Sequence, residues 1–260
     1  MKPLLYYSHS ILLFFFLSHI LFAQNIITDR PDQTESPITL EKGRLQIESG
    51  ILNQAEGEGS DALKSLIIPT NLFRYGISNK VELRMVLQLD GIEVYGDETY
   101  QFELGHVELG AKTVLNQTED SKVQIALLSH LQLPKRNWSH FEDQLGFFNR
   151  ISIAHNLTQK SSIGYNFGYN HYARGEGNLI YTLAIGHSIT EKLSIYFEPY
   201  GSIFSNSTPL FNFDYGFTYL IHSNLQLDLS FGQGLNDDMN YQSFGISWRQ
   251  KAKEKISPNP

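Results

Sequence analysis

Long segments in which large apolar side chains alternate with small or polar ones fill the sequence from residue 44 to residue 249. Residues 225–232 (LQLDLSFG), for example, place Leu or Phe at every odd position and Gln, Asp, Ser or Gly at every even one. Successive side chains of a β-strand point to opposite faces, so this period of two predicts strands with one apolar and one polar face. Since no window shows sustained apolar residues at helical spacing, the chain is expected to be all-β.

Turn residues divide this region into segments of 10 to 15 residues. The twelve expected strands are 44–53, 64–77, 81–92, 101–115, 123–134, 147–158, 162–173, 178–189, 193–204, 210–221, 225–235 and 239–249. They exceed the about 5–6 residues of a typical globular strand and suit the about 9–11 residues with which a tilted strand crosses a bilayer. An even number of long strands predicts a closed antiparallel up-and-down transmembrane β-barrel of about 12 strands.

The connections between these segments are of two kinds. Those after even-numbered strands are short and polar, such as residues 78–80 (SNK) and 190–192 (TEK), whereas several after odd-numbered strands are longer, such as residues 135–146. Outer-membrane barrels have short periplasmic turns and longer extracellular loops. The pattern therefore predicts that the even-to-odd turns lie at the periplasmic rim.

Composition excludes several other classes. The 260 residues carry a formal net charge of −7 and include no Cys, which argues against nucleic acid as a partner and excludes disulfide scaffolds and thiolate metal sites. The His residues of the expected mature chain are scattered without paired ligand spacing, so no metal and no cofactor are expected. The mean hydropathy of −0.25 excludes a bundle of membrane helices but not a barrel, in which only every second residue faces lipid.

The first 23 residues have the pattern of a secretory signal peptide. Lys2 supplies a positive charge, residues 11–22 (ILLFFFLSHILF) an apolar run, and Ala23 a small residue at the expected cleavage point. The expected organisation is a signal peptide at 1–23, a periplasmic N-terminal leader or strap at 24–43, a barrel at 44–249 and a polar tail at 250–260. Such a chain is exported to the bacterial outer membrane.

A soluble β-protein is the main alternative fold. A β-sandwich has about seven short strands in about 100 residues, so twelve long strands require two domains and a linker that the sequence lacks. A soluble closed barrel turns its apolar face inward and its charges outward. The large aromatic face predicted here is too extensive for contact with water.

If the apolar face meets lipid, the polar face lines the lumen. The lumen-lining candidates that we select by parity are Glu82, Arg84, Asp90, Glu108, Arg150, Tyr196, Glu198, Tyr200, Asp214 and Asp228. Because acids predominate, one interpretation is a narrow lumen that favours cations or neutral solutes. The other is an ion-pair network, with Arg74, Arg84 and Arg150 as the cations, that closes the lumen of a structural or adhesive barrel. The tyrosines could also stack an aromatic or hydrophobic solute.

Two motifs carry a resemblance to a known family. Residues 28–37 (TDRPDQTESP), followed by 42–48 (KGRLQIE), and residues 74–84 (RYGISNKVELR) resemble recurring motifs of an outer-membrane β-barrel family named for a transporter of the meta-pathway of phenol degradation. The resemblance implies a transporter or porin-like channel for small solutes, surrounded by outer-membrane lipid and inserted by the barrel assembly machinery. That machinery usually reads an aromatic residue at the end of the last strand, and Trp248 takes this place ahead of the polar tail.

The first motif cannot lie inside a strand. Pro31 lacks an amide donor, and the acids and hydroxyls around it favour turns. The motif residues Asp29, Arg30, Pro31, Asp32 and Glu35 form either a strap that enters or occludes the periplasmic mouth or a solvated leader. In the first case, we expect Arg30 to pair with a lumenal carboxylate or with a neighbouring acid.

A lipid-hydrolysing barrel is a less favoured alternative, and no enzymatic activity is expected. Such an enzyme needs Ser and His side by side on the lipid face with a third polar residue to orient the His. In the sequence, His187 precedes Ser188 and His222 precedes Ser223. Adjacent residues of a strand point to opposite faces, and the second pair lies in a turn, so neither pair meets the requirement.

Overall fold

The computed structural model describes residues 25–57, 59, 62–93, 99–116, 122–134, 144–172, 177–205 and 207–251. Within these residues there are twelve strands and no helix that is long and apolar enough to cross a membrane. The strands are β1 (Leu45–Glu56), β2 (Leu63–Ser78), β3 (Val81–Glu93), β4 (Tyr100–Asn116), β5 (Val123–Gln132), β6 (Gly146–Asn156), β7 (Ser161–His171), β8 (Gly177–Ser188), β9 (Leu193–Phe204), β10 (Leu210–His222), β11 (Leu225–Gly234) and β12 (Asn240–Arg249). Each overlaps one of the twelve expected segments, so the predicted number and order of strands are confirmed.

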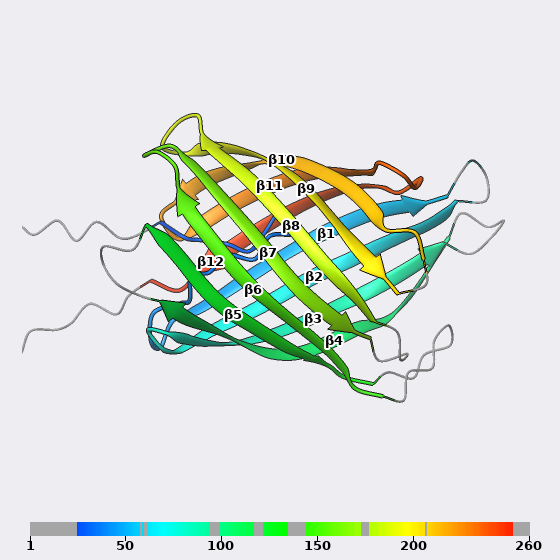
Figure 1. Cartoon of the computed structure of the whole chain (residues 1–260), viewed down its shortest axis with the longest axis horizontal. Coiled ribbons are helices and arrows are strands. Elements are labelled where there is room, and N and C mark those ends of the chain that lie inside the picture. Colours follow the sequence, from blue (N-terminus) through cyan, green and yellow to red (C-terminus); the bar gives the residue numbers. More distant parts are fainter. Residues whose placement is uncertain are drawn as a thin grey trace, which may run out of the picture.

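Every strand pairs antiparallel with its neighbours in sequence, and β1 pairs with β12 to close the barrel (Figure 1). The predicted closed antiparallel barrel is therefore confirmed. The signal peptide expected at 1–23 and most of the C-terminal tail lie outside the described residues.

The distribution of side chains is the reverse of that in a soluble protein. The largest fully buried side chains are all polar or charged, including Arg74, Lys112 and Glu198. Large apolar side chains are exposed on the outer surface instead; Phe167 is 57% and Phe244 49% exposed. A surface of this kind is stable in hydrocarbon, so the polar interior is the lumen of a membrane barrel and the soluble alternatives are excluded.

One irregularity decides which residues of β2 face the lumen. The register between β2 and β3 shifts between Ile67 and Thr70, around Pro69, which has no amide hydrogen to donate to a neighbouring strand. Between this shift and the β2–β3 turn, Arg74 pairs with Arg84 of β3, and both side chains are buried inside the barrel. Parity through a proline could not place Arg74, and the register shows that it lies in the lumen.

Candidate functional site

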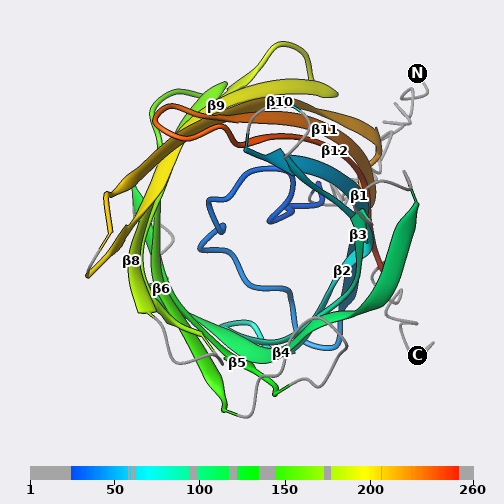
Figure 2. The same cartoon turned by 90° about the vertical axis from the view of Figure 1, so that its right-hand side faces the viewer.

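The chain that precedes β1 lies inside the barrel. Seen along the barrel, residues 25–44, which we call the lumenal segment, form a loop within the ring of strands (Figure 2). The amide of Ile26 donates to the carbonyl of Ser223 in the turn before β11 (2.7 Å), and the amide of Gly43 donates to the carbonyl of Gly76 near the end of β2 (2.7 Å). Both contacts lie at the rim of the even-to-odd turns, so the segment enters and leaves the lumen at the same rim.

Gly43 and Gly76 make this exit possible. Gly43 has a φ of 79°, in the left-handed region that glycine adopts without steric cost. A Cβ atom on Gly76 would lie 2.6 Å from the carbonyl oxygen of Leu40, because the segment passes directly over this point of the wall. The two glycines therefore let the chain turn tightly from the lumen into β1.

At its base the segment is held by a buried ion-pair cluster. Its members are Asp29 and Glu35 of the segment and Glu48, Arg74, Glu82, Arg84 and Lys112 of strands β1 to β4. Asp29 is central: its carboxylate is 2.8 Å from Nζ of Lys112 and 3.2 Å from Nη1 of Arg74, and it also accepts a hydrogen bond from Arg84. One acid of the segment thus connects cations from three consecutive strands.

Electrostatics favours the ionised form of Asp29. Burial by itself would raise the pKa of this carboxyl, but the nearby charges of Arg74, Lys112 and Arg84 outweigh burial and hold the pKa well below its usual value. Asp29 is therefore ionised at neutral pH. The contact with the cations does not depend on physiological changes in pH.

The same cluster also binds the backbone of the segment. The carboxylate of Glu48 accepts hydrogen bonds from the amides of Asp29 (2.9 Å) and Arg30 (3.0 Å), and that of Glu82 accepts one from the amide of Leu40 (2.9 Å). Arg74 in turn donates to the carbonyl of Ile38 (3.0 Å). Buried polar groups of an irregular backbone need such partners, so the wall of the barrel supplies what a sheet would otherwise provide.

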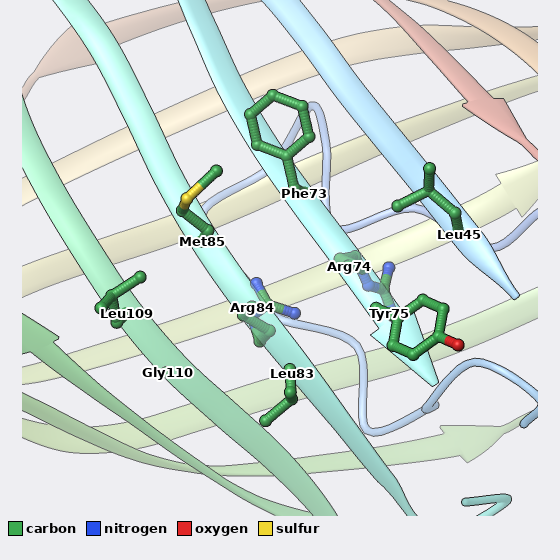
Figure 3. Close-up of a pocket in the computed structure, with 9 residues that line it drawn as sticks. All are labelled: Leu45, Phe73, Arg74, Tyr75, Leu83, Arg84, Met85, Leu109 and Gly110. Carbon is green, nitrogen blue, oxygen red and sulfur yellow. The ribbon is translucent and has the colours of Figure 1, made fainter. Parts of the chain in front are cut away.

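The apolar side of the same wall faces outward. Leu45, Phe73, Leu83 and other apolar side chains surround a shallow depression, whereas Arg74 and Arg84 belong to the opposite face of the same strands (Figure 3). We expect lipid acyl chains to fill this depression. The alternation along β2 and β3 thus separates membrane contact from the ion-pair cluster by the thickness of one sheet.

Arg30 contacts strands on both sides of the β1–β12 pair that closes the barrel. Its guanidinium forms an ion pair with Asp228 of β11 (3.0 Å) and donates to the hydroxyls of Ser243 on β12 (2.8 Å) and Thr70 on β2 (3.1 Å). It lies over Gly50 and Gly245, which are register partners across the closing pair of strands; a Cβ on either residue would come within 2.6 Å of the guanidinium. These glycines form a seat for Arg30.

Replacing Gly245 with Ala should therefore weaken the contact between the segment and the wall. The added methyl group would also meet the carboxylate of Asp228 at 2.6 Å, so we expect a loss of about 1–3 kcal/mol in the free energy of unfolding, measured by urea titration in lipid vesicles. The loss should shrink when Arg30 is first replaced by Ala, because the clashing group is then absent.

Gly186→Ala is the matched control for this prediction. Gly186 also lies in a strand on the lumenal parity, but a Cβ there would meet only the Ser162 hydroxyl at 3.2 Å. Its replacement should cost less than that of Gly245. Equal losses for the two alanine variants would show that the seat for Arg30 contributes nothing specific.

The apex of the segment contacts the opposite wall. The amide of Gln33 donates to the carboxylate of Glu198 on β9 (2.6 Å), and the hydroxyl of Thr34 donates to the same carboxylate (2.5 Å). The amide of Glu35 donates to the side chain of Asn166 on β7 (2.6 Å). Glu198 is five residues from the rim end of β9, about 16 Å along the strand at about 3.3 Å per residue, so the apex reaches the middle of the barrel.

Three carboxyl groups meet near this apex without a cation. Asp214 and Glu198 are register partners on β10 and β9, and both side chains are fully buried. Burial, and then the neighbouring Glu198 and Asp214, raise the pKa of Asp32 in the segment well above its usual value. We call Asp32, Glu198 and Asp214 the carboxyl cluster; no ion pair of the described residues includes any of them.

The remaining sequence candidates occupy different places. Glu82 and Arg84 belong to the ion-pair cluster, Asp228 pairs with Arg30, and Tyr196 and Tyr200 approach the carboxyl cluster. Glu108 binds the imidazole of His130 (2.7 Å), and Asp90 accepts a hydrogen bond from Gln88 (3.1 Å). Arg150 takes part in no ion pair of the described residues, so the expectation that it joins the network is wrong.

Sequence reasoning missed several groups that bind the segment. They are Asn166, Thr182, Gln46 and the glycine seat. Parity places each of these in the lumen, but a search restricted to charged and aromatic residues passes over them.

A Ser–His contact on the outer face was also missed. The hydroxyl of Ser161 on β7 lies 2.9 Å from Nδ1 of His187 on β8, across the strand pair, whereas Ser188 contacts Ser194. Among the described residues, no side chain is hydrogen-bonded to Nε2 of His187. The pair thus lacks the orienting third residue of a hydrolase. The described residues also contain no group of three or more acids or histidines that could hold a metal ion.

Solved outer-membrane proteins share this fold. An outer-membrane channel from Pseudomonas putida F1 superimposes with a TM-score of 0.65 over 85% of this chain and 100% of its own, at 11% identity. The KdgM porin in complex with disordered oligogalacturonate gives 0.53 over 78% and 98% of the two chains, at 12% identity. The NanC porin gives 0.53 over the same shares, at 10% identity. Comparison with curated protein sequences gave no match.

A family model matches the chain itself. The model described as "Putative MetA-pathway of phenol degradation" matches residues 28–249, from the lumenal segment to the end of β12. This range contains both motifs on which the resemblance rests, and it includes the segment as well as the barrel. The protein is therefore an outer-membrane β-barrel that belongs to the family of the MetA pathway of phenol degradation.

Proposed function

We propose that the protein is a channel of the bacterial outer membrane that admits small solutes through a lumen narrowed by its own N-terminal segment. One observation carries the proposal: the closed barrel has a largely polar interior, and residues 25–44 form a loop inside it that is held to the wall by ion pairs and hydrogen bonds. A segment held by ion pairs and hydrogen bonds can leave or shift without breaking the barrel. The strands then form the permanent wall and the segment the variable constriction.

The charge distribution supports a preference for cations or neutral solutes. The ion-pair cluster contains three cations and four carboxylates, and the carboxyl cluster contains acids only. Carboxylates that line a narrow pore favour cations and repel anions. Tyr196 and Tyr200 lie near the carboxyl cluster, and their aromatic rings suit contact with an aromatic or hydrophobic solute.

Purified protein in planar bilayers tests this proposal. We expect small single channels whose reversal potential in a salt gradient has the sign of cation preference. Flux of a neutral aromatic solute into vesicles that contain the protein should exceed flux into protein-free vesicles. Anion preference would contradict the charge argument.

A structural barrel without conductance is the second candidate, and the ion-pair cluster is the observation that favours it. This cluster joins the segment to β1, β2, β3 and β4 through fully buried side chains, which stiffens the wall. A structural barrel predicts no conductance and no solute flux both for the intact protein and for a variant without the segment. The channel proposal predicts conductance at least for the variant.

A further inference from the structure

The two walls that hold the lumenal segment differ in chemistry. At the base, every carboxylate of the ion-pair cluster lies within reach of an Arg or Lys side chain. At the apex, Glu198 and Asp214 are fully buried, and Glu198 binds the segment through hydrogen bonds from Gln33 and Thr34. No ion pair of the described residues includes either acid. Cations therefore neutralise the carboxylates at the base, whereas the carboxyl groups at the apex have no cation beside them within the described part of the chain.

Two buried carboxylates in contact cannot both remain ionised at low cost, because they repel each other and lose their hydration. Glu198 and Asp214 lie directly opposite each other on neighbouring strands and are both fully buried, which favours a proton on one of them. Within the described residues, Oδ1 of Asp214 has no hydrogen-bond partner, and Oδ2 accepts a hydrogen bond from the hydroxyl of Tyr241 (2.6 Å). A proton on one of the two carboxyl groups would therefore satisfy a buried oxygen that otherwise has no hydrogen-bond partner among these residues.

We propose that the carboxyl cluster is a proton-binding site that holds the apex of the lumenal segment against β7–β9, and that loss of its proton releases the apex while the ion-pair cluster retains the base. The inference rests on the proposed function, because it states how pH would regulate the width of the channel at the lumenal segment. It concerns the position of residues 31–34 only, because the carboxylate of Glu35 stays paired with Arg84 in the ion-pair cluster. Release of the apex widens the lumen at its middle without expelling the segment.

The groups around the cluster are consistent with this assignment. The titratable groups around its three acids are Tyr196 and Tyr200 from β9 and Tyr241 from β12, with Asp29 as the next carboxylate and Asp237 near Tyr200. The side chains from β7 and β8 are Asn166 and Thr182, which do not titrate. None of these groups supplies a positive charge.

The sign of the pH effect follows from linkage. Asp32 has a raised pKa only while it lies beside Glu198 and Asp214, so the docked apex binds more protons than a released one. Docking is therefore strongest at low pH and weakens as the pH rises through the raised pKa. Each unit of pKa difference between the two states changes their ratio about tenfold.

Because the protein contains no Cys, one introduced thiol reports on the apex. Ala184 of β8 is 7% exposed, and its register partner Gly164 lies under Thr34. We propose to measure the rate at which a membrane-impermeant thiol reagent modifies Ala184→Cys in vesicles as a function of pH. The rate is normalised to that of Lys192→Cys in an exposed turn, which corrects for ionisation of the thiol.

The normalised rate should rise at least about tenfold from low to high pH in the otherwise native chain. Glu198→Gln and Asp32→Asn should each remove most of this rise. Asp32→Asn changes no residue of the barrel wall, so it still tests the proposal if Glu198→Gln impairs folding. Asp238→Asn, which neutralises an exposed acid of the loop between β11 and β12, should preserve it. A pH-independent rate, or an unchanged rise in both Glu198→Gln and Asp32→Asn, would overturn the proton site.

Solute flux separates this inference from the proposed function. If thiol modification follows pH but neither conductance nor flux is seen at any pH, the proton site stands and the channel proposal fails. If the protein conducts and the thiol rate is independent of pH, the channel stands and the proton site fails.

Discussion

Deletion of residues 25–40 should raise the single-channel conductance severalfold. The segment reaches the middle of the barrel and contacts walls on both sides, so its removal leaves the lumen bounded by the strands alone. The deletion removes Asp29, Asp32 and Glu35 together with Arg30, a net loss of two negative charges from the lumen. We therefore expect weaker cation preference as well as larger currents in planar bilayers.

A matched variant separates the effect of volume from that of charge. Replacement of Asp29, Arg30, Asp32 and Glu35 by their amides or by Gln within the full-length chain removes the same charges but retains the backbone of the segment. It should change ion selectivity more than conductance unless the segment leaves the lumen. Unchanged conductance in the deletion variant would show that the segment does not limit flow.

The replacement of Arg74 by Met should produce the largest loss of stability of any single substitution considered. Arg74 is 1% exposed and lies between the carboxylates of Asp29, Glu48 and Glu82 at 2.9–3.2 Å. Removing one partner of a buried ion pair costs about 3–5 kcal/mol because the remaining charge stays buried without compensation. Urea titration of the folded protein in lipid vesicles, followed by Trp fluorescence, measures this change in the free energy of unfolding.

Arg150→Met is the control for this substitution. Arg150 also faces the lumen but belongs to no ion pair of the described residues, so we expect a change below about 1 kcal/mol. A second replacement, Glu82→Gln, in the Arg74→Met background should recover part of the loss, since it removes one of the uncompensated charges. Equal losses for the two Arg variants would contradict the assignment of Arg74 to the anchor.

The wall of the barrel was predictable because each strand responds to two solvents at once. The strict alternation in β12, where Phe244, Ile246 and Trp248 face lipid and Ser243, Gly245 and Ser247 face the lumen, repeats a pattern that needs only neighbouring residues to be read. The same rule places Glu82, Arg84, Glu198, Asp214 and Asp228 inside. Pro69 interrupts the alternation before Arg74, so only the observed strand register shows which way Arg74 faces.

The interior contacts were not predictable in the same way. Asp29 meets Lys112 and Arg30 meets Asp228 across 83 and 198 residues of sequence, and several alternative acids could have paired with Arg30. Which pairs form depends on the height of each residue along a tilted strand and on the path of the segment. The alternation of side chains along a strand gives neither the height of a residue in the barrel nor the path of the segment.

The sequence by itself determined an all-β, twelve-stranded barrel and which face of each regular strand is apolar, because hydrophobic burial in lipid acts on each strand locally. Only the tertiary structure decided that residues 25–44 loop inside the barrel, that three cations hold Asp29, and that Glu198 and Asp214 meet Asp32 without a cation. The physical reason is that charge compensation in a buried site is set by distances of a few ångströms between groups far apart in the chain.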